Sequence, residues 1–334
     1  MHQFFKLLFM AALAIGTLIA ISSYSWLSMW IGLEINLLSI IPLLSDPKNL
    51  YPSEAALKYF ITQAMASTIL LFSIMCSFNL NEVFSFDQSP VALMMMDSAL
   101  LTKMGAAPFH AWFPEVMDGL SWMNGLIMLT WQKLAPMVII MYMTKPTLFI
   151  SSAIIFSSVI GGILGLNQIS LRKIMAYSSI NHIGWMIGSM LNAQTIWLVY
   201  FMIYSLISLN IIVIFHMLNI FYLKQLFNSL NSNKTFKFFF ILNFLSLGGL
   251  PPFLGFFPKW LTINNLVTNN FLMVSIILII STLITLFFYL RITFSTMVIN
   301  SKEMIILEVS HNTLLMILLN TISLAGLVAC TLIF

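Results

Sequence analysis

Two segments, GAAPFHAWFPE at Gly105–Glu115 and GLPPFLGFFPK at Gly249–Lys259, share five of eleven residues without a gap and lie 144 residues apart. Each interrupts an apolar run with glycine and proline. Pro108 in the first segment, and Pro251 and Pro252 in the second, lack the backbone N–H that an α-helix needs, and a proline ring clashes with the preceding helical turn. The sequence therefore predicts two broken helices, each with its break next to the glycine that opens the segment.

The rest of the chain is too apolar for a soluble domain. Of its 334 residues, 60% are hydrophobic and only 7% are charged, and the mean hydropathy is +1.00. A soluble domain needs charged side chains to cover its surface, so this composition indicates a polytopic membrane protein. We expect one membrane domain over residues 1–334. The net charge of +4 is too weak and too dispersed for a nucleic-acid partner.

Eleven apolar runs are long enough, at about 20 residues, to cross a membrane as helices. They cover residues 4–22, 24–43, 56–79, 91–114, 122–143, 147–167, 173–191, 195–221, 237–264, 271–296 and 313–333. The first ten form two sets of five, in residues 1–145 and 146–296, and each broken segment is fourth in its set. Because an odd number of helices inverts the second set, the sequence predicts two inverted five-helix repeats and a C-terminal helix in 297–334.

Basic residues fall almost entirely on one side of this arrangement. When the loops are assigned alternately to the two sides of the membrane, only Lys145 lies on one side. The other side holds Lys6, Lys48, Lys58, Arg172, Lys173, Lys224, Lys234, Lys237 and Lys302. Because Lys and Arg favour the negative side of a membrane, we expect the N-terminus in the cytoplasm or matrix and the C-terminus opposite.

Four charged residues lie well inside predicted spans: Glu34, Lys103, Lys133 and Lys259. A charge at the membrane centre costs about 2.5–3.5 kcal/mol on insertion scales, so these groups need water or one another. Lysine, unlike arginine, can take up and release a proton, and a nearby carboxylate favours its charged form. The pattern favours a proton relay. The alternatives are lysines that extend to the interface and, for Glu34, a protonated structural carboxyl.

Other polar residues inside the spans are weaker candidates. His182 lies among hydroxyl and amide side chains in AYSSINHIGW, which suits a water chain, although a structural histidine is the ordinary alternative. His110 follows the first break, where a structural histidine is again the ordinary alternative, Asp97 precedes Lys103 by six residues on a poorly matched helix face, and Arg291 is polar without belonging to a motif. The two cysteines stand alone in apolar runs, and no spacing typical of a metal, nucleotide or redox site occurs.

The segments KMGAAPFHAW, WQKLAP, SLRKIMAYSSINHIGW and GGLPPFLGFFPKW, taken in this order, closely resemble the antiporter-like membrane subunits of respiratory complex I. That family is related to multisubunit cation/proton antiporters, and the resemblance covers residues 5–296. It implies a core of two inverted repeats, each with a broken helix. It also implies a proton pathway through Glu34, Lys103, Lys133 and Lys259, with His182 between the half-channels.

The resemblance further implies partners and a location. The expected partners are the other membrane-arm subunits of NADH:ubiquinone oxidoreductase, lipids and protons. The expected location is the mitochondrial inner membrane, with the N-terminus on the matrix side and the C-terminus on the intermembrane-space side. The chain itself is expected to bind no cofactor or metal. NADH, FMN, iron–sulfur clusters and ubiquinone are expected in the whole complex, where other subunits carry out the redox chemistry.

Two other functions fit the same residues. A free-standing cation/proton antiporter would have similar helices, although the spans offer few carboxylates for a metal cation. A structural scaffold subunit could keep the buried charges and translocate nothing. The sequence leaves both alternatives open.

Overall fold

The computed structural model describes residues 2–46, 49–83, 90–143, 148–230, 234–298 and 320–321. All named elements in these ranges are α-helices, and one isolated bridge pairs Ser170 with Tyr222. Helices suit a membrane because they satisfy their backbone hydrogen bonds internally. The chain divides into two compact units, residues 1–153 and 154–334.

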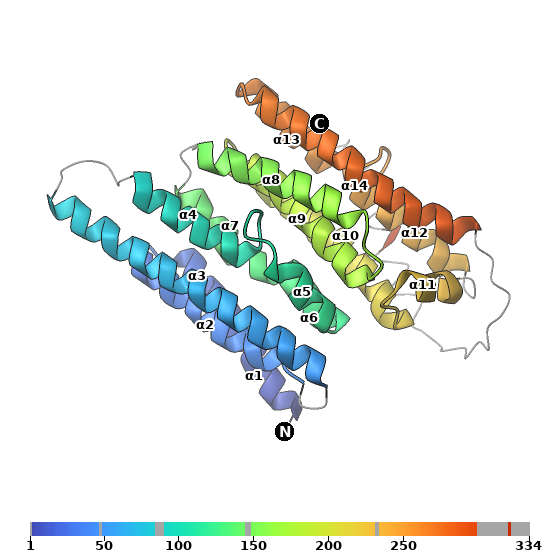
Figure 1. Ribbon diagram of the computed structural model, residues 1–334, viewed down its shortest axis with the longest axis horizontal. Helices are drawn as coiled ribbons and strands as arrows, with labels where there is room; N and C mark the ends of the chain where they lie inside the picture. The colour runs from blue at the N-terminus through green and yellow to red at the C-terminus, as the bar shows by residue number, and fades with distance from the viewer. Residues whose placement is uncertain are drawn as a thin grey trace. The chain divides into compact units, whose positions relative to one another are not determined.

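The first unit contains α1 to α7, and α8 crosses its boundary into the second unit. The bounds are α1 (His2–Ser22), α2 (Trp26–Leu44), α3 (Leu50–Val83), α4 (Pro90–Met104), α5 (Trp112–Gly119), α6 (Trp122–Leu129), α7 (Trp131–Met143) and α8 (Leu148–Gly165). In Figure 1, α1, α2 and α3 lie side by side, and α2 contacts both of its neighbours. α3 also packs against α4 and α5, and α7 packs against α1, α2 and α4.

The second unit is built around α9. After α8, the helices of this unit are α9 (Leu171–Met190), α10 (Gln194–Leu218), α11 (Leu223–Leu230), α12 (Lys234–Gly248), α13 (Phe256–Thr268) and α14 (Leu272–Val298). α9 packs against α10, α13 and α14, and nearly all of its residues are buried. Its polar residues therefore lie in the protein interior. A helix that is buried all round needs no separate polar face.

The helices follow the ten predicted spans of residues 4–296 closely. Seven helical segments of the described chain are long and apolar enough to cross a membrane. The other three predicted spans are α9, which is rich in polar residues, and the two segments that break into α4 with α5 and α12 with α13. The eleventh predicted span, 313–333, lies outside the described residues except for 320–321.

Two features of the helices were not predicted. The span 122–143 is divided at Thr130 into α6 and α7, and the Thr130 hydroxyl donates to the carbonyl of Leu126 at 2.7 Å. The short helix α11 occupies a stretch that the sequence assigned largely to a connection, and it packs against α12 and α14 with Leu226 and Leu230 buried.

Candidate functional site

The two broken segments interrupt their helices at equivalent positions. α4 ends at Met104 and α5 begins at Trp112, while α12 ends at Gly248 and α13 begins at Phe256. The two helix ends, Met104 and Gly248, lie 144 residues apart, and so do the two helix starts, Trp112 and Phe256. This is the offset between the two similar segments of sequence. The peptide bonds Ala107–Pro108 and Pro251–Pro252 are cis.

The first helix of each pair ends with the same hydrogen-bond pattern. Gly105 and Gly249 have left-handed φ angles of +74° and +77°, which only glycine adopts without strain. The amide of each glycine bonds the carbonyl three residues earlier, and the next amide bonds the carbonyl five residues before it. This is a Schellman motif, and it does not use the last two carbonyls of the helix. Those carbonyls belong to Lys103 and Met104 in α4 and to Leu247 and Gly248 in α12.

Lys103 lies in the last turn of α4 with its side chain buried. Gln63 of α3 donates its amide N–H to the backbone carbonyl of Lys103 at 3.3 Å. The indole N–H of Trp112 donates to the carbonyl of Thr102 at 3.1 Å. Neutral donors therefore close this end of α4.

Glu34 of α2 is half-buried and acts electrostatically on Lys103. In the described part of the chain, no ion pair within 4 Å joins the two. The two side chains therefore make no direct ion pair in this structure. A carboxylate stabilises a charged lysine more strongly when it is closer. A change in the distance between Glu34 and Lys103 would therefore change the stability of the charged lysine.

Beside Lys103 lies a chain of neutral hydrogen bonds that the sequence reasoning missed. The hydroxyl of Tyr59 donates to Gln132 at 3.2 Å, and the amide of Gln132 donates to Asn36 at 2.9 Å. All three side chains are buried. The sequence gives only a weak indication of this chain, because each of the three polar residues stands alone in its own helix. No sequence pattern shows that α2, α3 and α7 bring them together.

A small cavity lies among these residues. Lys103, Tyr59, Asn36, Gln63 and Gln132 line it together with apolar side chains, and about 10 Å³ is open to the centre of a water molecule. This volume is at the lower limit for one water. The polar lining and the size fit a single water beside the lysine.

Lys133 is almost completely buried on α7, with 1% of its surface exposed. Its ammonium lies 5.5 Å from the centre of the Phe113 ring, a distance at which the ring attracts a cation. Phe113 in turn packs against Gly105, since a Cβ at Gly105 would lie 3.0 Å from the Cβ of Phe113. The first break and Lys133 therefore meet through one aromatic ring.

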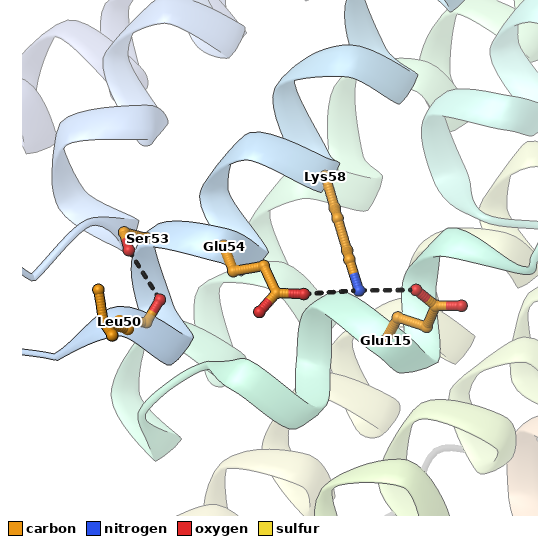
Figure 2. Close-up of polar contacts among 5 residues, drawn as sticks. All are labelled: Leu50, Ser53, Glu54, Lys58 and Glu115. Atoms are coloured by element: carbon orange, nitrogen blue, oxygen red, sulfur yellow. Dashed lines mark hydrogen bonds and ion pairs between the residues drawn. The ribbon is translucent and has the colours of Figure 1, made fainter.

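Glu115, the last residue of the first repeated segment, lies in a separate surface cluster. Figure 2 shows Lys58 of α3 between Glu54 and Glu115, with a carboxylate oxygen of each 3.1 Å from Nζ. The three side chains are 44–63% exposed, so this cluster contributes little stability. It joins α3 to α5 beyond the break and takes no part in the buried site.

Lys259 occupies the position equivalent to Glu115 and is instead buried, with 7% of its surface exposed. Its ammonium donates to the carbonyl of Gly248 at 2.8 Å and to that of Leu247 at 3.4 Å. It also lies 5.9 Å from the centre of the Trp185 ring. The lysine after the second break thus folds back onto the end of α12.

His182 lies in the buried face between α9 and α10. Its Nδ1 and the Tyr200 hydroxyl share a hydrogen bond of 2.9 Å, and the ring of Tyr204 lies 5.0 Å from its own ring. A second small cavity, also of about 10 Å³, is lined by His182, Tyr200, Leu247 and Pro258 among others. This cavity therefore touches both the histidine and the end of α12 that Lys259 contacts.

The remaining candidates lie apart from these groups. Asp97 is buried within α4, Arg291 is exposed on α14, and the imidazole of His110 lies 3.3 Å from the carbonyl of Pro108. In the described ranges, no group of three or more His, Cys, Asp or Glu side chains is placed to hold a metal ion. Glu34, Lys103 and Lys133 belong to the first unit, and His182 and Lys259 to the second.

Comparison with known proteins gives a consistent result. Residues 23–285 match the family described as "NADH:quinone oxidoreductase/Mrp antiporter, TM". The chain is 50% identical to "NADH-ubiquinone oxidoreductase chain 2" of Anopheles gambiae over 98% of its length and 97% of the relative's. It is 51% identical to the protein of the same name from Aedes aegypti, with the same coverage.

A solved structure shares the fold. A chain of respiratory complex I from Thermus thermophilus, determined with bound aureothin, superposes with a TM-score of 0.85 at 23% sequence identity. The similarity covers 97% of this chain and 78% of that one.

Proposed function

Because the chain belongs to the NADH:quinone oxidoreductase/Mrp antiporter family of transmembrane proteins, we propose that its buried lysines translocate protons within NADH:ubiquinone oxidoreductase. The chain is a membrane subunit of this enzyme, respiratory complex I, and a multi-pass mitochondrial protein. The proposed step is proton transfer alone. Redox chemistry with NADH, FMN, iron–sulfur clusters and ubiquinone takes place in other subunits.

The proposed architecture is two inverted five-helix repeats followed by one C-terminal helix. Its support is the common offset of 144 residues, which relates the sequence segments, both helix ends and both helix starts at the breaks. With five spans in each repeat, the second copy enters the membrane in the opposite sense. The N-terminus then lies on the matrix side of the inner membrane and the C-terminus on the intermembrane-space side. The chain as a whole contacts other membrane-arm subunits and lipid.

In the first repeat, Glu34 controls the charge on Lys103. A nearby carboxylate favours the ammonium form, and moving it away favours proton release. The cavity beside Lys103 can hold one water, which would carry the proton toward Gln132, the middle residue of the hydrogen-bonded chain. Lys133, next to Gln132 in the sequence and held over Phe113, is the next acceptor.

In the second repeat, His182 and Lys259 continue the path. His182 shares a hydrogen bond with Tyr200, and imidazole can accept a proton on one nitrogen while it donates from the other. Lys259 then passes the proton to the exit side.

The observation that carries this proposal is the burial of three lysines, Lys103, Lys133 and Lys259, in a chain with few charges. Lysines are kept so far from solvent only where the protein supplies partners or water, and such groups mark ion pathways.

The test is Lys133→Met in the assembled complex, reconstituted in sealed vesicles. We expect fewer protons translocated per NADH oxidised, because methionine keeps the side-chain length and cannot hold a proton. Lys58→Met is the matched control, since Lys58 is exposed and lies outside the pathway. An unchanged proton-to-NADH ratio in Lys133→Met would refute the relay and favour a scaffold role. Exchange of Na⁺ or K⁺ for protons by the purified chain without NADH would favour an antiporter.

A further inference from the structure

The end of α12 is closed by a charged group, and the contact is specific. The Schellman motif at Gly249 does not use the carbonyls of Leu247 and Gly248, and these are the two oxygens to which the Lys259 ammonium donates. The last carbonyls of a helix carry the negative end of its dipole, so a cation is stabilised there. Lys259 is therefore a side-chain cap of α12.

The first break has the same backbone pattern and a different cap. There the amide of Gln63, from another helix, donates to the carbonyl of Lys103. An amide keeps its donor strength whatever the protonation of its surroundings. At the second break the strength of the cap depends on a proton, because a charged donor makes a hydrogen bond roughly twice as strong as a neutral one.

Among the described residues of the second unit, no carboxylate shares this role with the helix end. Residues 119–302 contain neither aspartate nor glutamate. The titratable groups on the helices packed against α13 that lie near the break are His182 of α9, Tyr200 and Tyr204 of α10, and Tyr289 of α14. In the described part of the chain, the two carbonyls accept hydrogen bonds from the ammonium, and the centre of the Trp185 ring lies 5.9 Å from it.

The capped helix end also forms a wall of the His182 cavity. Ser246 and Leu247, at the end of α12, line the cavity with Gly255 and Pro258 from the start of α13. Its volume of about 10 Å³ is at the limit for one water, so a small movement of either helix end changes whether water fits.

We propose that Lys259 is a charge-dependent cap of α12, so that release of its proton loosens the second break and opens the cavity beside His182 to water. This inference rests on the proposed function in one respect, that a proton visits Lys259. It adds a conformational role to that residue: the same proton that leaves Lys259 changes the hydration of the group next to it on the path.

The test is hydrogen–deuterium exchange on the assembled complex, followed at the amides of Gly249 and Leu250. We expect Lys259→Met to speed exchange there by about tenfold, because a hydrogen bond to a charged donor is lost. Lys259→Arg keeps a permanent positive charge, so its exchange should stay near the wild-type rate. The amides of Gly105 and Ala106, at the break capped by Gln63, provide the internal control and should be unaffected in both variants.

Two results would overturn the cap: wild-type exchange in Lys259→Met, or equally fast exchange in the Arg and Met variants. If Lys259→Met does not assemble, Lys259→Gln replaces it, and exchange no faster than in Lys259→Arg overturns the cap equally. Protons pumped per NADH, measured on the same preparations, test the pathway separately. Unchanged pumping in Lys259→Arg would remove Lys259 from the pathway while fast exchange in Lys259→Met still established the cap.

Discussion

At the scale of single residues, the buried lysines depend on neutral neighbours as much as on charges. Tyr59, Gln132 and Asn36 form a chain in which Tyr59 donates to Gln132 and Gln132 donates to Asn36. A buried polar group that loses its partner costs about 1–3 kcal/mol, so the chain holds its members in fixed orientations. This order positions the water-sized cavity next to Lys103.

We predict that Gln132→Leu destabilises the chain by about 1–3 kcal/mol for each group left unpaired, since Tyr59 loses its acceptor and Asn36 loses its donor. The measurement is the thermal stability of the chain within the solubilised complex. Gln168→Leu is the matched control, because the hydrogen bond that the amide of Gln168 donates to the carbonyl of Leu164 is exposed. Equal effects of the two substitutions would show that the buried hydrogen bonds contribute nothing.

At the scale of helices, α1 and α2 form a closely packed pair. Gly16 and Gly32 lie at their contact, and a Cβ at Gly32 would be 2.5 Å from the backbone nitrogen of Ala20. Small residues allow this approach, which membrane helices use because lipid provides no hydrophobic force to join them. The contact with α1 sets the orientation of α2 and therefore the positions of Glu34 and Asn36.

We predict that Gly32→Val separates α1 from α2 and destabilises the first unit by about 1–3 kcal/mol, the usual cost of overpacking. The added side chain would meet backbone atoms of Ala20, which cannot move aside as a flexible side chain could. Native gels after mild heating should show earlier loss of this chain from the complex. Ile31→Val, on the exposed face of the same helix, should leave unchanged the midpoint temperature at which the chain is lost from the complex. A normal midpoint for Gly32→Val would contradict the close contact.

At the scale of the whole molecule, the charges are distributed unevenly. The carboxylates of the sequence lie at or before Asp118 or at and after Glu303, while basic residues occur in both units. In the sequence, the lysines and arginines of the loops and span ends fall mainly on one predicted side of the membrane. Membrane insertion responds to this bias, so the bias determines the orientation that we propose.

We predict that Tyr24→Cys, at a fully exposed residue between α1 and α2, reacts with a membrane-impermeant thiol reagent from the intermembrane-space side. Lys224→Cys, on the exposed side of α11, should react only after the inner membrane is opened. The unsubstituted chain measures the background from its two native cysteines. The reverse pattern of labelling would invert the proposed topology.

The helices and their breaks could be predicted from the sequence because they depend on local properties. Apolar length defines a span, and glycine with proline interrupts it wherever the helix cannot continue. The predicted membership of the complex I family is confirmed, and the solved relative shares the fold. The short helix α11 escaped because its buried leucines are recognised only once α12 and α14 are in place.

The sequence by itself determined that the chain is a helical membrane protein with two broken segments and buried lysines. Only the tertiary structure decided what those lysines contact. Asn36 and Gln132 are 96 residues apart and Gln63 and Lys103 are 40 apart, and no periodicity of one helix specifies such pairs. The matched positions Glu115 and Lys259 show the physical reason: one is exposed beside Lys58 and the other is buried on the end of α12, because packing between helices determines which groups meet.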